Sequence, residues 1–266
     1  AARDRGPEAA NQAATAIMTT DTRSKQVLVP GRGFTVGGMA KGAAMLAPDM
    51  ATMLAVLTTD AAVEPAALRR ALRDAVSRSF NQMTVDGCTS TNDTVVVLAS
   101  GAASAAAGHD SPPTPAELTD ALWEACADLA GQMAADAEGA TKVVRVKVVG
   151  AASAEEAAAG ARKIAQSQLV KCSFYGQDPY WGRVISELGS AGIAFDLDRV
   201  KISYGGITVC RAGVEAGDAA QAEALKAVMA LPTVELVADL ALGTGEAAMI
   251  TCDLGHGYID ENMGTS

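Results

Sequence analysis

One threonine lies in an apolar run in which a strand has no need of a hydroxyl group. The run reads PDMATMLAVLTTDA (residues 48–61), and in it Thr52 follows the small residue Ala51. A hydroxyl group needs a base before it can act as a nucleophile, and the α-amine of an N-terminal threonine can be that base. This amine has an ordinary pKa of about 7.7 to 8.0, so a substantial fraction is unprotonated near neutral pH. Cleavage before Thr52 would therefore create a nucleophile, although the chemistry alone still favours a threonine that fills a strand.

The other reactive side chains form weaker patterns. A serine–histidine–aspartate triad needs a base poised against the nucleophile, and we interpret His109 as part of a Ser/Pro loop and His256 as a polar residue at a strand end. The stretch GRGFTVGG (31–38) lacks the glycine spacing of a nucleotide-binding loop, which favours a flexible turn near an active site. Five cysteines stand singly, and a local Cys/His zinc site is not predicted.

Helices and short β-branched runs alternate along the chain, and these elements must position any site. Apolar periodicity predicts helices at residues 63–83, 115–136, 153–168 and 216–230. In the first of them the apolar stripe consists of Leu68, Leu72, Val76 and Phe80. Runs rich in β-branched residues predict strands at 93–100, 141–150, 198–210, 233–242 and 246–254, and Met53 to Leu57 reads as a further strand.

Local signals sharpen three of these elements. Thr114, followed by Pro115 and Glu117, is typical of a capped helix start. The segment 141–150 alternates Lys or Arg with Val, the period of a sheet with one wet face. Gly205-Gly206 can adopt the positive φ of a two-residue turn, which predicts a hairpin. The pattern as a whole indicates a mixed, layered α/β protein.

The composition argues against some classes of function but does not identify one. The 266 residues suffice for one large or two small domains, and the apolar share of 49% with 20% charged residues is ordinary for a globular chain. A net charge of −10 argues against non-specific binding to nucleic acid. No run approaches the roughly 18 to 20 apolar residues of a membrane span, and no secretory signal is apparent. The scattered cysteines favour a reduced, cytoplasmic protein.

Five stretches, in this order, resemble one family. They are MTTDT (18–22), VGGMAKGAAMLAPDMATMLAVLTTDA (36–61), SFNQMTVDGCTSTNDTVVVLASG (79–101), AEGATK (137–142) and KCSFYGQDPYWGR (171–183). Together they resemble the ornithine acetyltransferase family, also called glutamate N-acetyltransferase. The resemblance implies a layered α/β fold with an N-terminal-nucleophile-like site and self-cleavage between Ala51 and Thr52. Residues 1–51 would then be the C-terminal part of an α chain and residues 52–266 a β chain within one structural unit, assembled as a heterotetramer of two α and two β chains.

The resemblance also implies an acyltransferase reaction and its site. An acetyl group would pass from N-acetylornithine to Thr52 and then to glutamate in ping-pong fashion, with no cofactor. The positions that match the family's substrate-binding residues are Thr19, Lys41, Thr52, Glu138, Asn262 and Ser266. A lysine can meet a substrate carboxylate and a glutamate an ammonium. Taken alone, Lys41 and Glu138 would read as solvated surface charges.

Three features depart from the family's pattern. Asp49 stands where the family generally has Asn, and the short C-terminus ENMGTS (261–266) leaves Thr265 as an alternative to Ser266. The family also carries an upstream segment with a Thr-Gly pair that forms the oxyanion hole. The Thr-Gly of GTGE (243–246) is out of order and is not assigned that role. We therefore expect this sequence to be part of a longer chain.

Three other functions remain open. An amidase or peptidase of the same fold would use water as the acyl acceptor. An added acetyl-CoA-dependent activity would make N-acetylglutamate directly. A non-enzymatic assembly protein with a dead site would keep the Ala51–Thr52 bond intact.

Overall fold

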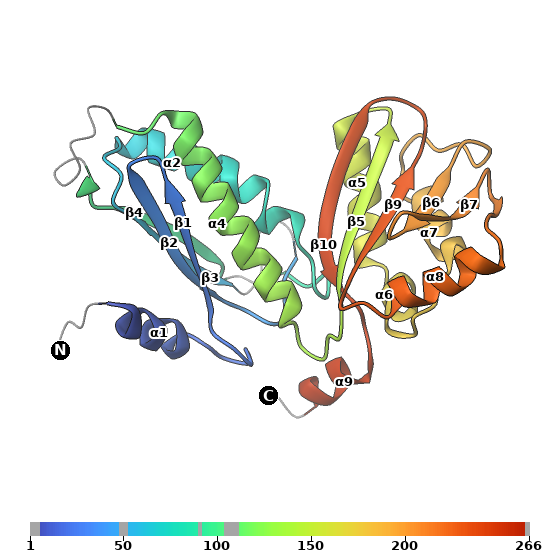
Figure 1. Cartoon of the computed structure of the whole chain (residues 1–266), viewed down its shortest axis with the longest axis horizontal. Helices are drawn as coiled ribbons and strands as arrows, with labels where there is room; N and C mark the ends of the chain where they lie inside the picture. Colours follow the sequence, from blue (N-terminus) through green and yellow to red (C-terminus); the bar gives the residue numbers. More distant parts are fainter. Residues whose placement is uncertain (1–5, 48–52, 90–91, 104–111, 264–266) are drawn as a thin grey trace. The chain divides into compact units, whose positions relative to one another are not determined.

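A computed structural model describes residues 6–47, 53–89, 92–103 and 112–263 (Figure 1). The chain divides into two compact units, residues 1–137 and 138–266. Ala51, Thr52 and Ser266 lie outside the described residues, as do Asp49 and Thr265. None of the helices in the described ranges is both long and apolar enough to span a bilayer.

The first unit is built on a four-stranded sheet in the order β1-β2-β3-β4. Its strands are β1 (Lys25–Gly31), β2 (Phe34–Lys41), β3 (Leu54–Thr59) and β4 (Thr94–Ala99). The first three strands are antiparallel neighbours, whereas β3 and β4 run parallel. Its helices are α1 (Pro7–Ala16), α2 (Pro65–Ser77), the short 3-10 helix η1 (Phe80–Gln82) and α4 (Pro115–Ala135).

Helix α4 packs on one face of this sheet and forms the core of the first unit with it. The predicted cap is confirmed, because the Thr114 side chain accepts from the N–H of Glu117 and the Glu117 side chain accepts from the N–H of Thr114. The inner face of β3 contributes Ala55 and Leu57, both fully buried. The opposite face is only partly covered by α1, and Leu28 there is 74% exposed.

The helix predicted at 63–83 is shorter than its pattern suggests. Helix α2 ends at Ser77, and Phe80 is buried in η1 instead. Helix α2 packs against α4. The most deeply buried side chains of α2 are small, since Ala71 and Ala75 are buried whereas Leu72 is half-buried.

The second unit contains a six-stranded sheet in the order β10-β5-β9-β6-β7-β8. Its strands are β5 (Val143–Ala151), β6 (Lys201–Tyr204), β7 (Ile207–Arg211), β8 (Val214–Glu215), β9 (Thr233–Asp239) and β10 (Gly245–Cys252). Its helices are α5 (Ala154–Gln166), α6 (Gln168–Tyr175), α7 (Trp181–Gly189), α8 (Ala219–Met229) and α9 (His256–Asn262). The alternation predicted for β5 is confirmed, because Val144, Val146 and Val148 are all buried beneath α5. The predicted hairpin is also confirmed, with Gly205 and Gly206 at φ 53° and 82° between β6 and β7.

Two predictions were wrong. The stretch 31–38 is mostly strand: Gly31 ends β1, Gly33 turns the chain at φ 77°, and the rest begins β2. His256 begins a helix rather than ending a strand.

The sheet of the first unit joins residues from both sides of the predicted cut at 51/52. Strands β2 and β3 pair over six positions, from Val36 opposite Thr59 to Lys41 opposite Leu54. Backbone hydrogen bonds of a sheet ladder therefore link the segment before the cut to the segment after it.

Candidate functional site

Lys41 lies beside the beginning of β3. It is the last residue of β2, half-buried, and pairs with Leu54, which follows Thr52 by two residues. The register of the sheet therefore brings the predicted carboxylate-binding residue next to the strand that starts just after the predicted nucleophile.

Asp21 ties Thr19 to the residue that follows Lys41. Its Oδ2 accepts from the backbone N–H of Thr19 at 3.1 Å, and its Oδ1 accepts from the N–H of Gly42 at 2.7 Å. Burial by itself would raise the pKa of Asp21, but the hydrogen bonds from Gly42, Lys25 and Thr19 outweigh it and hold that pKa below its ordinary value. One carboxylate thus fixes the backbone of the predicted site residue Thr19 and of Gly42, the residue next to the predicted site residue Lys41.

A fully buried lysine holds this arrangement in place. Lys25 Nζ donates to Asp21 Oδ1 at 2.6 Å and to Asp136 Oδ2 at 2.5 Å, and its side chain is 0% exposed. Asp136 in turn accepts from the backbone N–H of Thr22 at 3.0 Å and from its hydroxyl group. Arg23 Nε also lies 3.8 Å from Asp136 Oδ1, but its side chain is 58% exposed, so Lys25 is the buried cation that both carboxylates share.

In the second unit, Glu138 and Asn262 lie together. The Nδ2 group of Asn262 donates to Glu138 Oε2 at 2.8 Å, and Glu138 is only 8% exposed. The structure therefore pairs two of the predicted substrate residues, whose sequence positions are 124 apart.

Helix α9 can approach Glu138 closely because the residue after Glu138 is a glycine. The N–H of Gly139 donates to Glu261 Oε1 at 3.0 Å, and a Cβ atom on Gly139 would overlap the backbone of Gly257 and Tyr258. Asp253 strengthens the same junction by accepting from the N–H groups of Thr141 and Lys142 at 2.8 and 2.9 Å. The loop 138–142 is thereby joined to the end of the chain.

We expect Gly139→Ala to displace α9. The residue has φ 64°, which costs an alanine roughly 1 to 2 kcal/mol, and the new methyl group would also collide with the helix. Amide exchange of residues 256–262 should become faster, and activity that depends on Asn262 should fall. Gly192→Ala is the matched control, because Gly192 also has a positive φ of 71° but faces open space. Equal exchange in α9 of the two variants would contradict the close packing at Gly139.

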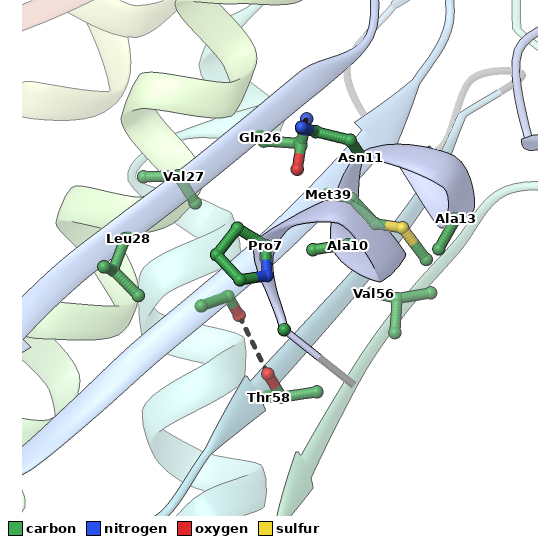
Figure 2. Close-up of a pocket in the computed structure, with 13 residues that line it drawn as sticks. Pro7, Ala10, Asn11, Ala13, Gln26, Val27, Leu28, Met39, Val56 and Thr58 are labelled. Atoms are coloured by element: carbon green, nitrogen blue, oxygen red, sulfur yellow. Dashed lines mark hydrogen bonds between the residues drawn. The ribbon is translucent and has the colours of Figure 1, made fainter. Parts of the chain in front are cut away.

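A groove of about 630 Å³ lies between α1 and the open sheet face, and none of the described residues that line it is a predicted site residue. Figure 2 shows Pro7, Ala10, Met39 and Val56 around it, and none of the described residues that line it is an acid or a base. Its chemistry suits packing rather than group transfer.

Asp93 is a buried carboxylate that sequence reasoning missed. Its Oδ1 accepts from the N–H of Met53 at 2.7 Å. Burial raises the pKa of Asp93, while the Met53 hydrogen bond and the charge of Lys41 oppose that rise. Within the described ranges no group of three or more Cys, His, Asp or Glu side chains could hold a metal ion.

Comparison with known proteins gives a consistent set of similarities. The ArgJ family model matches residues 2–264. The chain is 48% identical to the "Arginine biosynthesis bifunctional protein ArgJ" of Mycobacterium tuberculosis (strain H37Rv) over 96% of this chain and 61% of that protein. It is 45% identical to the protein of the same name from Thermobifida fusca, over 100% of this chain and 66% of that one.

A solved structure shares the fold. The crystal structure of the arginine biosynthesis bifunctional protein ArgJ from Bacillus halodurans aligns with a TM-score of 0.71 and 38% identity, over 78% of this chain and 96% of that one. The chain spans about three-fifths of the length of the mycobacterial relatives that it matches.

Proposed function

Because the chain belongs to the ArgJ family, we propose that it transfers an acetyl group from N-acetylornithine to glutamate through an acetyl-Thr52 intermediate. The observation that carries this proposal is the family match over residues 2–264, which includes every predicted site residue except Ser266. The relatives' name, which refers to arginine biosynthesis, agrees with both substrates.

Cleavage comes first in the proposed mechanism. The Thr52 hydroxyl attacks the Ala51 carbonyl, the peptide C–N bond breaks, and water hydrolyses the resulting ester. This leaves a carboxylate on Ala51 and an α-amine on Thr52. The alignment covers 78% of this chain but 96% of the solved Bacillus halodurans chain, so that chain is about as long as residues 52–266. This similarity in length supports such a division.

Acetyl transfer then uses the new amine as the base. The amine takes the proton of the Thr52 hydroxyl as its oxygen attacks the acetyl carbonyl, and that proton leaves with the released amino group of ornithine. The amine of glutamate next attacks the threonyl ester, which forms N-acetylglutamate and restores the hydroxyl group. No coenzyme is needed, because both half-reactions move one acyl group between an amine and an alcohol.

The proposed substrate contacts follow from charge. Lys41 binds a substrate carboxylate, and Glu138 binds an ammonium group. Thr19, Asn262 and Ser266 add hydrogen bonds. Asp21 anchors the backbones of Thr19 and Gly42, which supports the proposed roles of Thr19 and Lys41. The hydrogen bond between Glu138 and Asn262 supports the proposed roles of those two residues.

The proposal extends to assembly and compartment. Two chains of residues up to 51 and two of residues 52–266 form the heterotetramer. None of the five cysteines, which all lie within the described ranges, is in a disulfide bond, in line with the reducing, cytoplasmic location that we propose.

We expect ornithine release from N-acetylornithine to depend on glutamate. The test incubates the full-length protein with N-acetylornithine, with and without glutamate, and measures the ornithine and N-acetylglutamate that are formed. With glutamate present, the two products should appear in equal amounts. Lys41→Met and Glu138→Gln should raise KM because each removes one charge that the substrates need. Sustained release of ornithine without glutamate would show a hydrolase instead, and N-acetylglutamate made from acetyl-CoA alone would reveal a second activity.

A further inference from the structure

Two lysines lie at the same end of the first sheet but point to opposite faces. Lys25 begins β1 directly opposite Ala40 on β2, and both side chains are buried in the core. Lys41 is the next residue along β2, so the alternation of a strand turns its side chain to the other face. None of the acidic residues in the described ranges forms an ion pair with Lys41, and the charge of Asp93 acts on it from further away. Lys41 is therefore a half-buried cation that can meet an anionic ligand.

Asp21 connects the end of β2 to Thr19. Its two oxygens accept from different backbone N–H groups, Oδ2 from Thr19 at 3.1 Å and Oδ1 from Gly42 at 2.7 Å. The whole hairpin of β1 and β2 lies between these two residues in the chain. A single carboxylate, 7% exposed, therefore sets where one predicted substrate residue lies relative to the backbone that follows the other.

The turn after Lys41 depends on this carboxylate. Gly42 has φ 144°, in a region that L side chains rarely adopt, and its N–H donates to Asp21 outside the sheet ladder. Shortly after it, Ala43 and Leu46 are buried, at 2% and 0% exposed, so the chain turns into the core here. Loss of the hydrogen bond to Asp21 would therefore release the end of β2 that carries Lys41.

The two carboxylates of the buried cluster position different parts of the backbone. Lys25 Nζ donates to Asp21 Oδ1, the same oxygen that accepts from Gly42. The hydrogen-bond partners of Asp21 are all donors, so both of its oxygens must act as acceptors. Asp136 shares the lysine, and its other hydrogen bonds come from Thr22. The contact with Thr19 and Gly42 thus distinguishes Asp21 from Asp136.

We propose that Asp21 is a positioning residue for substrate binding, which aligns Thr19 and Lys41 on the α-carboxylate of the substrate. This inference rests on the proposed function, in which those two residues bind the substrates. N-Acetylornithine and glutamate both carry an α-carboxylate, and the ping-pong reaction accepts them in turn. One fixed arrangement of a hydrogen-bond donor and a cation can therefore serve both half-reactions. Asp21 acts through the backbone and does not touch the substrate.

Donor preference separates this role from a general loss of stability. N-Acetylputrescine is N-acetylornithine without the α-carboxylate, so the ratio of kcat/KM for the two donors measures what that group contributes. Asp21→Asn leaves one acceptor oxygen for two N–H groups and a lysine. In the full-length protein we expect KM for N-acetylornithine to rise with kcat little changed. The ratio should fall about tenfold, the effect of one charge-assisted hydrogen bond.

Asp136→Asn is the matched control. It removes the same charge from beside the same lysine but leaves Asp21 in contact with Thr19 and Gly42. This variant should keep the donor preference of the parent protein even if its thermal unfolding temperature falls as far as that of Asp21→Asn. Asp21→Asn added to Lys41→Met should lower the ratio less than it does in the parent protein, because the carboxylate has already lost its cation.

A charge-conserving variant covers the case in which Asp21→Asn does not fold. Asp21→Glu keeps a negative charge beside Lys25 but moves the carboxylate by one methylene group, so it should also lower the ratio. A folded variant of Asp21 with the donor preference of the parent protein would overturn the inference and leave the proposed function intact. An equal loss of preference in Asp136→Asn would overturn it as well. A parent protein that transfers no acetyl group to glutamate would overturn both the inference and the proposed function.

Discussion

Thr52→Ala should remain one uncut chain and transfer no acetyl group. The substitution removes the hydroxyl that attacks Ala51 and later carries the acetyl group, so it stops both processes. Removal of a catalytic nucleophile costs about 10⁶-fold in kcat in a well-studied hydrolase, and we expect a loss of that order. Intact mass spectrometry follows the cut, and ornithine release follows the transfer.

Two further variants make this prediction specific. Thr52→Ser keeps a hydroxyl and should still be cut and form an acyl-enzyme. Thr58→Ala removes another hydroxyl from the strand that follows, one that only donates a long 3.5 Å hydrogen bond to Gly37, and should be cut and active. A Thr52→Ala protein that still divides between residues 51 and 52 would contradict the proposed mechanism.

Lys25→Met should destabilise the first unit by about 3 to 5 kcal/mol. The methionine can fill the volume of the lysine stem, but it leaves Asp21 and Asp136 buried without their shared cation. Thr19 should lose its fixed position with them, because Asp21 holds its N–H. Urea denaturation measures the change in the free energy of unfolding.

An exposed pair provides the control for this effect. Lys226 and Glu223 form an ion pair at 3.1 Å with side chains 75% and 78% exposed, so Lys226→Met should change stability by less than about 0.5 kcal/mol. The triple change of Lys25→Met with Asp21→Asn and Asp136→Asn removes the uncompensated charges and should recover part of the loss. Equal stability of the two lysine variants would show that the buried cluster does not hold this unit together.

Local patterns predicted those elements whose signals are local. The alternation in β5, the Thr114 cap and the Gly205-Gly206 turn each depend on residues within a few positions of one another. The hairpin of β1 and β2 was missed because its glycines resemble loop residues. Gly38 instead permits close packing, since a Cβ atom there would press against Leu57 on β3. Such a reason becomes visible only when the neighbouring strand is in place.

The site was predictable only in part for the same reason. The resemblance placed Lys41 and Glu138 in motifs that match the family, but it did not indicate which residues hold them in position. Lys25 meets Asp136 across 111 positions of sequence, and Asp93 meets Met53 across 40. Neither pairing leaves a periodic or motif signal, because the fold alone brings the partners together.

The pairing of β2 with β3 gives the proposed cut a consequence for assembly. Before the cut, the two strands are tethered by the chain between them, and their association is intramolecular. After the cut, the same ladder joins separate polypeptides, so the cleaved protein becomes an obligate complex whose apparent stability depends on protein concentration. The uncut precursor can fold by itself, whereas two separated fragments must find one another again by diffusion. Dilution after denaturation should therefore slow refolding of the cleaved protein but not of the uncut precursor.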